Sequence, residues 1–363
     1  MSDICIDRIC RYFETPSGKV TLGIDGFVDE VWEVVCVRKS PTEYVLYDKM
    51  KDFAKSVYDT GEGGYANEII RKRRSHGGFT AHTGEAVDRL GINLTLVGMF
   101  GKDEVDPVYR VFSEACKVYT VGPTGLCPTL EFKDGKILLP YSEEIVNVDW
   151  AQLTSALPPQ QMDNAYGSAD IVGLAYWSLL NNFNDLVVKL CENAVKPGAR
   201  MFFDFADIRK RNKQALMDSL KILAELNGKN PMILSLNEHE AGILFSYMER
   251  SFDWRKPETA DRDIEYIRKQ AGLDELIIHT PYFAVAATAA EGTAVVLQRY
   301  CDNPKITTGA GDNFNGGYIS ASAQKGMLNL KERLLTANAT TLFYITNGYS
   351  PDRAELRRTL ELF

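Results

Sequence analysis

Short apolar runs alternate with longer amphipathic segments along most of the chain. The strand-like runs cover residues 20–24, 93–98, 170–175, 200–204, 231–236, 275–279 and 293–298. Segments with apolar residues at helical spacing lie near 181–196, 208–226, 237–250, 260–271, 311–325, 328–347 and 353–362. Strands that alternate with helices are typical of crossover units in a parallel sheet. The pattern therefore predicts an α/β fold in which a central, mostly parallel sheet is flanked by helices.

Two segments interrupt this alternation. Residues 124–140 contain two strand-like runs around the turn dipeptide Asp134-Gly135, which is a hairpin signal. Residues 27–37 continue past the first strand with mixed alternation. We expect both segments to supply strands of a small β lid, within a single domain that spans residues 1–363. A lid that closes over a substrate excludes water from the reaction.

Residues 45–74 carry apolar side chains at helical spacing, with a break at residues 61–64. They predict an amphipathic, interrupted helix. Arg71-Lys-Arg-Arg74 then forms a solvated face of that helix, as short runs of charge usually do. The alternative is that these cations lend positive potential to the nearby pair Gly77-Gly78.

Composition limits the classes of partner. The chain has 363 residues, a formal net charge of −8, 45% hydrophobic residues and 25% charged residues. These values are ordinary for a globular protein, and the acidic excess argues against nucleic acid or a membrane surface as the main partner. No stretch approaches the ~20 apolar residues of a membrane span. The N-terminal residues lack a basic segment followed by an apolar run, so we expect no signal peptide.

Seven cysteines are scattered along the chain, at positions 5, 10, 36, 116, 127, 191 and 301. They form no Cys-x-x-Cys pair and have no histidines at the spacing of metal ligands. An odd, scattered set is typical of reduced thiols. We therefore expect a cytoplasmic protein without a disulfide framework or a zinc site.

Residues 305–318 run from an expected strand end through a glycine-rich turn into a helix. Gly309 and Gly311 allow a tight turn and close approach to a ligand, because neither has a Cβ. The amides from Ala310 onward are then unpaired first-turn donors, which favour a phosphate or a developing negative charge. Asp312 would repel a bound phosphate, so we interpret it as a proton acceptor for phosphoryl transfer. The alternative is a helix-capping residue.

Other polar residues follow predicted strand ends, where open α/β sheets bind ligands. Asp25 ends the first strand, and Asp29 lies just beyond it. Asn237 ends another strand and begins a helix, with Glu240 three residues later. This pair is either a capping box or part of a water-mediated magnesium shell.

These motifs, in this order and spacing, resemble the ribokinase-like (PfkB) family of sugar and nucleoside kinases over nearly the whole chain. The most specific match is Thr307-Thr-Gly-Ala-Gly-Asp312, followed by Phe314 and Gly317. The other matches are the helix that follows Gly77-Gly78 and ends at Leu90-Gly91, residues 98–103, Asn237-x-x-Glu240, and residues 337–348. The resemblance implies the ribokinase-like fold and a kinase that uses ATP and Mg²⁺.

The resemblance also implies a role for each matching residue. Asp312 becomes the general base, and the amides of Gly309, Ala310 and Gly311 become the anion hole. The sugar would be bound by Asp25, Asp29, Gly77 and Gly78, with His82 alongside. Magnesium and phosphate would be held, through water, by Asn237 and Glu240, and the nucleotide by Thr280, Thr307 and Asn338. Members of this family often form dimers through the lid, so a homodimer is a further expectation.

The chain departs from the family pattern at several positions. Ile306 stands where the family usually has an Asp, and His82 stands where it usually has an Asn. A histidine there either donates to a sugar hydroxyl or packs away from the ligand. Tyr282 and Val285 replace glycines of the family's Thr-x-Gly-x-x-Gly segment. A close approach of this backbone to the nucleotide phosphates is therefore not implied.

We predict an ATP- and magnesium-dependent carbohydrate kinase that phosphorylates a primary hydroxyl of a small sugar or related polyol. One alternative is a nucleoside kinase, with Phe27, Trp32 or Phe79 as an aromatic shelf at the acceptor site. The other is a sugar- or nucleotide-binding sensor without turnover, which the departure at Tyr282 favours. The intact glycine turn with Asp312 argues against the sensor, because a protein that only binds has no use for a base there.

Overall fold

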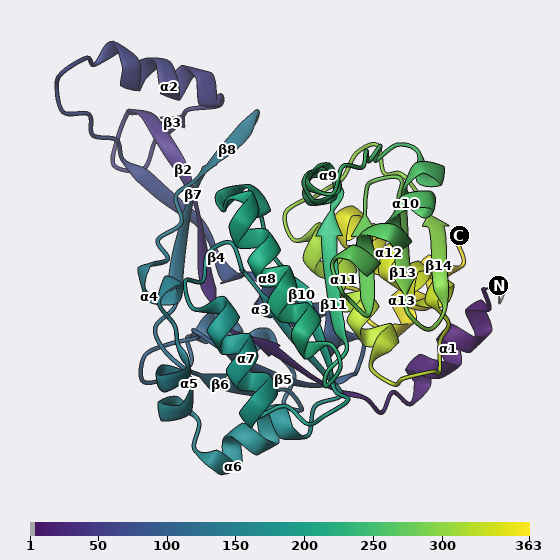
Figure 1. Ribbon diagram of the computed structural model, residues 1–363. Coiled ribbons are helices and arrows are strands. Elements are labelled where there is room, and N and C mark those ends of the chain that lie inside the picture. The colour runs from purple at the N-terminus through teal and green to yellow at the C-terminus, as the bar shows by residue number, and fades with distance from the viewer. Residues whose placement is uncertain (1–3) are drawn as a thin grey trace.

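The computed structural model describes residues 4–363 and has one large sheet between two layers of helices, with a smaller sheet that projects from it (Figure 1). The first three residues of the segment considered for a signal peptide lie outside the described residues. Within residues 4–363, no helix combines the length and the apolar character needed to cross a membrane.

The main sheet has nine strands in the described part of the chain. In spatial order they are β14 (Gly292–Leu297), β13 (Phe283–Thr288), β12 (Glu275–His279), β11 (Met232–Asn237), β10 (Arg200–Asp204), β9 (Ile171–Ala175), β1 (Lys19–Gly23), β5 (Asn93–Gly98) and β6 (Lys117–Thr120). The strands from β12 to β6 pair in parallel, whereas β13 and β14 are antiparallel to their neighbours. The predicted central, mostly parallel sheet is confirmed.

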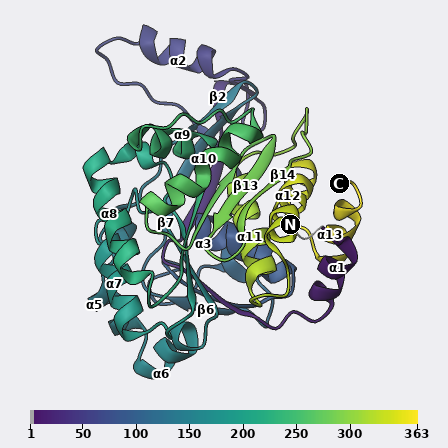
Figure 2. The same ribbon diagram turned by 45° about the vertical axis from the view of Figure 1, so that its right-hand side comes forward.

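Helices cover both faces of this sheet (Figure 2). One layer contains α5 (Trp150–Ala156), α7 (Phe183–Asn193), α8 (Lys213–Leu226), α9 (Glu238–Tyr247) and α10 (Pro257–Gln270). The other contains α1 (Ile6–Glu14), α3 (Phe79–Arg89), α11 (Ala310–Ser322), α12 (Leu330–Asn347) and α13 (Arg353–Leu360). The shorter helical segments are η1 (Pro107–Val111), α4 (Glu143–Val146), α6 (Pro159–Met162), η2 (Asp163–Gly167) and η3 (Ile208–Lys210).

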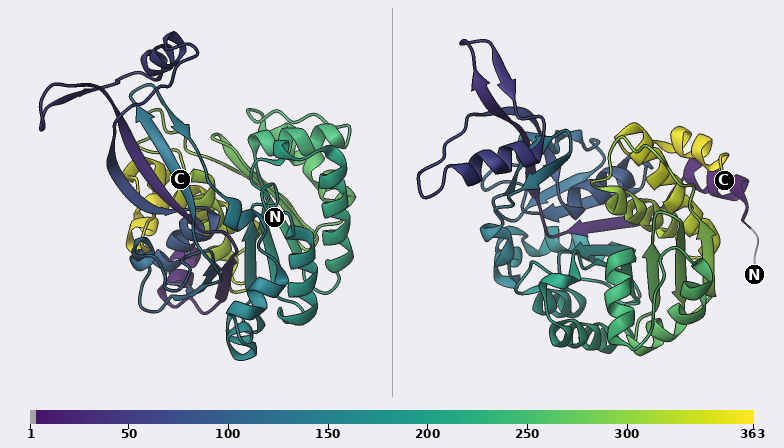
Figure 3. Two further views of the ribbon diagram at one scale, coloured as in Figure 1. Left: turned by 90° about the vertical axis from the view of Figure 1, so that its left-hand side faces the viewer. Right: turned by 90° about the horizontal axis from the view of Figure 1, so that it is seen from above.

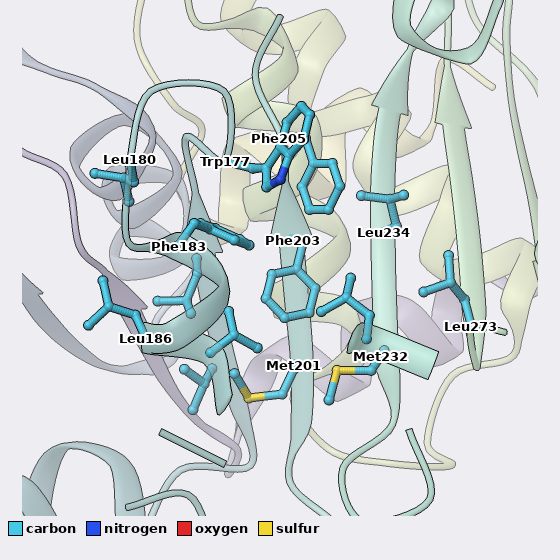
Figure 4. Packing of buried hydrophobic residues seen from close by; sticks show 14 of the residues in the cluster. Trp177, Leu180, Phe183, Leu186, Met201, Phe203, Phe205, Met232, Leu234 and Leu273 are labelled. Atoms are coloured by element: carbon cyan, nitrogen blue, oxygen red, sulfur yellow. The ribbon is translucent and has the colours of Figure 1, made fainter. Parts of the chain in front are cut away.

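The alternation of side chains along each strand divides the core between these layers. On β10, Met201 and Phe203 pack with the cluster under α7 and α8, as Figure 4 shows, whereas Phe202 belongs to the cluster on the opposite face. Successive side chains of a strand point to opposite faces, so a strand that is apolar at every position is buried on both. The short continuous apolar runs of the sequence are explained by this two-sided burial.

The second sheet, which we call the lid sheet, stands away from the main sheet (Figure 3). It contains β3 (Tyr44–Leu46), β2 (Phe27–Arg38), β7 (Gly125–Phe132) and β8 (Gly135–Leu138) in that order, and β4 (Ile69–Gly77) pairs with β2. Helix α2 (Met50–Asp59) lies between β3 and β4 in the chain. Both segments expected to supply lid strands therefore lie in this sheet.

The predicted helix over residues 45–74 is wrong outside α2. Its last third is β4, which pairs with β2 over most of its length. Arg74 pairs with Asp106 at 2.7 Å, and Lys72 pairs with Glu131 of β7 at 2.6 Å. These cations are exposed, as expected, but they lie on a strand and not on a helix, because a neighbouring strand offers a backbone ladder that outweighs weak helical periodicity.

Candidate active site

The glycine turn begins α11 at the edge of the sheet where the parallel strands end. Gly309 is the N-cap and has φ of +83°, and a Cβ there would lie 2.7 Å from the hydroxyl oxygen of Tyr344. That hydroxyl donates to the carbonyl of Thr308 at 2.7 Å, and the side-chain amide of Asn313 donates to the carbonyl of Gly309 at 3.0 Å. The turn is therefore held rigidly, and glycine at 309 is required by both conformation and space.

The free amides of this turn differ from the predicted set. The amide of Ala310 donates to the carbonyl of Thr307 at 3.2 Å. Among residues 4–363, the amides of Gly309, Gly311 and Asp312 have no hydrogen-bond acceptor. The donors open to an anion are thus those of Gly309, Gly311 and Asp312, and Ala310 drops out because the turn uses its amide internally.

Asp312 lies in the first turn of α11 and is partly buried. In the described part of the chain no side chain makes a capping hydrogen bond to this helix, so the capping alternative for Asp312 is wrong. Burial is the largest cause that raises the pKa of Asp312; His82 lowers this pKa, the charges of Asp204, Asp25 and Asp29 raise it, and together they give about 7. A carboxylate whose pKa lies near neutrality is suited to accept a proton from an alcohol.

Asp25, which follows β1, is completely buried. Its Oδ1 accepts from the amide of Thr80 at 3.0 Å and from the Thr80 hydroxyl, whereas its Oδ2 has no hydrogen-bond partner among residues 4–363. A Cβ at Gly78 would lie 2.0 Å from this Oδ2. Burial raises the pKa of Asp25 to about 6 although both hydrogen bonds from Thr80 lower it. Asp25 thus presents a free acceptor directly against the glycine that begins α3.

Asp29 of β2 lies on the other side of the glycine pair. A Cβ at Gly77 would lie 2.4 Å from an Asp29 carboxylate oxygen, and the Nε2 of His82 lies 3.9 Å from the other one. Burial disfavours protonation of His82, but Asp29 and Asp312 outweigh it and raise the pKa of the imidazole. His82 therefore does not pack away from the site; it lies among the predicted acceptor-binding carboxylates.

Asn237 and Glu240 form a complete capping box at the start of α9. The Glu240 carboxylate accepts from the amides of Asn237 at 3.0 Å and Asp207 at 2.7 Å. Burial and the nearby charge of Asp204 raise the pKa of Glu240 above its usual range. Within the described residues, no three His, Cys, Asp or Glu side chains are arranged to hold a metal directly. Buried acids whose oxygens already accept backbone amides fit a hydrated cation held through water.

A cavity of about 370 Å³ lies between α1 and α13, but the larger one, of about 730 Å³, extends from Asp312 and Gly311 along the ends of β10, β11 and β12. Thr280 and Thr307, two of the residues expected to bind the nucleotide, line the larger cavity. Asn338 does not line it. Its side-chain amide is buried and donates to the carbonyls of Val296 and Leu297 at 3.3 and 3.4 Å. Thr341, one turn further along α12, faces the cavity instead.

Two features of the site escaped the sequence analysis. Lys136 of β8 in the lid sheet donates to the hydroxyl of Thr308, beside the glycine turn. The sequence signal that could have found Lys136 is its position directly after the hairpin turn Asp134-Gly135. Side chains alternate along β8, so Lys136 lies on the opposite face from Gly135 and Ile137. The second feature is a group of aromatic residues in separate loops, for which the sequence carries no local signal.

The rings considered as a nucleoside shelf are engaged within the protein, although Phe79 also lines the larger cavity. Phe27 and Phe79 are 6% and 2% exposed. The guanidinium of Arg71 lies over the ring of Trp32, 5.8 Å from its centroid. We call Asp25, Asp29, Gly77, Gly78 and His82 the acceptor end. Its carboxylates, imidazole and glycine backbone have the chemistry to bind the hydroxyls of a sugar.

Comparisons with known proteins agree with this geometry. The family model of prokaryotic ketohexokinases matches residues 4–363. A ketohexokinase from Haloferax volcanii is 28% identical over 347 residues, which cover 94% of this chain and 90% of that protein.

Solved structures of similar fold come from several kinases. Phosphofructokinase-2 from Escherichia coli aligns with a TM-score of 0.62 at 13% identity, over 95% of this chain and 99% of that one. Ribokinase from Thermotoga maritima aligns with a TM-score of 0.60 at 16% identity, and the nucleoside kinase from Methanocaldococcus jannaschii with 0.58 at 16%, each over 95% of this chain and 99% of theirs. These identities establish the fold alone, and the expected ribokinase-like fold is confirmed.

Proposed function

The chain belongs to the prokaryotic ketohexokinase family, and from this membership we propose that it transfers the γ-phosphoryl group of ATP to a primary hydroxyl of a ketohexose. Carbohydrate kinase activity follows from the family. The ketohexose as acceptor and the residue roles below are our proposal.

The single observation that carries the residue roles is the combination of a free-amide turn and a partly buried acid within one helical turn. Asp312 takes the proton of the acceptor hydroxyl, whose oxygen then attacks the γ-phosphorus as the bond to the β-phosphate oxygen breaks. The amides of Gly309, Gly311 and Asp312 stabilise the charge on the transferring group. Because the pKa of Asp312 is about 7, the base is substantially ionised near neutral pH.

The acceptor end supports a polyhydroxylated, uncharged substrate. Asp25 and Asp29 offer acceptors to sugar hydroxyls, and His82 lies beside Asp29 as a donor. A phosphate or carboxylate group already present on the acceptor would be repelled by the charges of Asp25, Asp29 and Asp312.

A divalent cation such as Mg²⁺ would neutralise charge on the nucleotide phosphates, as in other phosphoryl transfers. Asn237 and Glu240 would hold it through water, with Asp204 adding negative potential to the same end of the cavity. Glu240, in turn, is oriented by the amides of Asn237 and Asp207.

The test is a screen for ADP formation with purified protein and Mg²⁺-ATP against ketohexoses, aldohexoses and nucleosides. We expect turnover with a ketohexose such as fructose and much slower turnover with nucleosides. Preferred turnover of a nucleoside, or ATP binding without ADP release for every acceptor, would overturn the proposed acceptor or the proposed activity respectively.

A further inference from the structure

The segment that departs from the family pattern carries an aromatic cluster at one end of the large cavity. The ring of Tyr282 lies 5.1 Å from that of Tyr300 between centroids, with planes 4° apart, and 5.5 Å from that of Trp254. The rings come from the β12–β13 turn, the chain after β14 and the loop before α10. All three line the cavity that also contains Gly311 and Asp312. We call Trp254, Tyr282 and Tyr300 the aromatic wall.

The aromatic wall lies at the margin of the hydrophobic core, against which Tyr282 packs. Tyr300 is 53% exposed, and Trp254 and Tyr282 are only partly buried. Exposed aromatic faces that gather in a cavity mark a binding surface more often than a packing one. The wall also shares its cavity with Thr307 at the glycine turn, so a ligand on the rings reaches the phosphoryl-transfer end.

Backbone hydrogen bonds hold Tyr282 in place before any ligand binds. The hydroxyl of Thr280 accepts from the amides of Tyr282 and Phe283, each at 3.0 Å. The amide of Gln298 donates to the carbonyl of Tyr282 at 2.7 Å. Because the main chain is fixed on both sides, little conformational entropy is lost when a ligand contacts the ring.

We propose that the aromatic wall binds the nucleobase of the phosphate donor by stacking. This inference rests on the proposed function, because a donor must place its phosphates at the glycine turn while its base reaches the rings. Aromatic faces stack on planar heterocycles irrespective of the pattern at the edge of the base. The chain thus uses a ring at position 282, where the related pattern has a glycine that brings only backbone near the nucleotide.

The experiment compares Tyr282→Ala and Tyr300→Ala with Tyr282→Phe, which keeps the ring, and with Tyr58→Ala, which removes a tyrosine from the lid helix that is 85% exposed. The KM for ATP, the KM for the sugar and inhibition by inorganic tripolyphosphate are measured for each. We expect both cavity alanine variants to raise the KM for ATP on the order of tenfold. The KM for sugar and the inhibition constant of tripolyphosphate, which has no base, should not change. Tyr282→Phe should bind ATP as the parent does.

An unchanged KM for ATP in both cavity alanine variants would overturn the proposal. So would a parallel loss of tripolyphosphate inhibition, since that indicates distortion of the phosphate site. Tryptophan fluorescence gives a readout that needs no turnover: ATP should change the emission of the parent protein but not of Trp254→Phe, and tripolyphosphate should change neither. If no acceptor supports ADP release, this titration still shows whether the aromatic wall binds the nucleobase. Failure of the proposed function is therefore distinguishable from failure of the inference.

Discussion

The Nε2 atom of His82 lies 3.9 Å from a carboxylate oxygen of Asp29, a contact that joins α3 to the lid sheet beside Asp312, the proposed general base. The ring of His76 on β4 lies 5.3 Å from that of His82, and Glu85 lies 3.4 Å from Nε2 of His76. Asp29 and Asp312 raise the pKa of His82 from two other elements, and a protonated imidazole there would offset the mutual repulsion of the carboxylates.

The pH profile should follow the ionisation of Asp312. Because its pKa is raised to about 7, kcat/KM should rise as pH increases through about 7, where the base loses its proton. His82 lowers the pKa of Asp312, so His82→Asn should move this acid limb to higher pH. The measurement is kcat/KM for the sugar between pH 5.5 and 9 in both proteins. If the acid limb of the kcat/KM profile lies at the same pH in His82→Asn as in the parent, His82 does not influence the pKa of Asp312.

Asp312→Asn should lower kcat by about 10²- to 10⁴-fold while the Kd for ATP is retained, because only proton transfer is lost. Asp185→Asn, an exposed change in the first turn of α7, is the matched control and should leave turnover unchanged. Turnover measured by ADP release and binding measured by calorimetry distinguish the two effects. Retained turnover in Asp312→Asn would exclude it as the base.

The same variant should be more stable than the parent above neutral pH. A carboxyl whose pKa rises from 3.8 to about 7 on folding contributes stability that is lost as pH rises through that window. Asn carries no such cost, so its advantage should grow between pH 4 and pH 7 and stay constant above. Thermal melts at pH 5 and pH 8 should show a gain of about 2 °C or more at the higher pH. An equal difference at both pH values would contradict a raised pKa.

Lys136→Met should weaken the contact between the lid sheet and the glycine turn. Loss of a charged donor beside the transferring phosphoryl group should lower kcat/KM on the order of tenfold, as expected for a hydrogen bond from a charged group. Lys133→Met is the control, because Lys133 lies across the same hairpin turn and pairs with Asp48 at 2.8 Å. Equal effects of the two substitutions would show that charge on the hairpin matters and the contact with Thr308 does not.

Gly78→Ala should destabilise the protein and abolish sugar binding. Gly78 has φ of +88°, and its added Cβ would lie 2.0 Å from the Oδ2 of Asp25, which must then move away from Thr80. Gly198 has φ of +84°, but a Cβ added there would meet no atom of the described residues within 4 Å. Gly198→Ala should therefore lower the free energy of unfolding only by the cost of the left-handed conformation, about 1 kcal/mol. Denaturant unfolding and the sugar KM compare the two. Equal losses would show that the clash with Asp25 is relieved without consequence.

The features that the sequence alone determined are local ones, which depend on residues close together in the chain. The apolar runs specified the parallel sheet because strands buried on two faces need apolar residues at every position. The glycine turn with Asp312 could be predicted to bind an anion because the prediction depends on consecutive residues, whose backbone freedom and amides are properties of the turn itself.

The tertiary structure decided what depends on partners distant in the chain. β4 is a strand because β2 lies beside it, and Asn338 points away from the cavity because the carbonyls of β14 accept its amide. The pKa of His82 is raised because Asp29 and Asp312 approach it from two other elements. The aromatic wall likewise exists only where three loops meet, and short-range sequence patterns hold no information on such contacts.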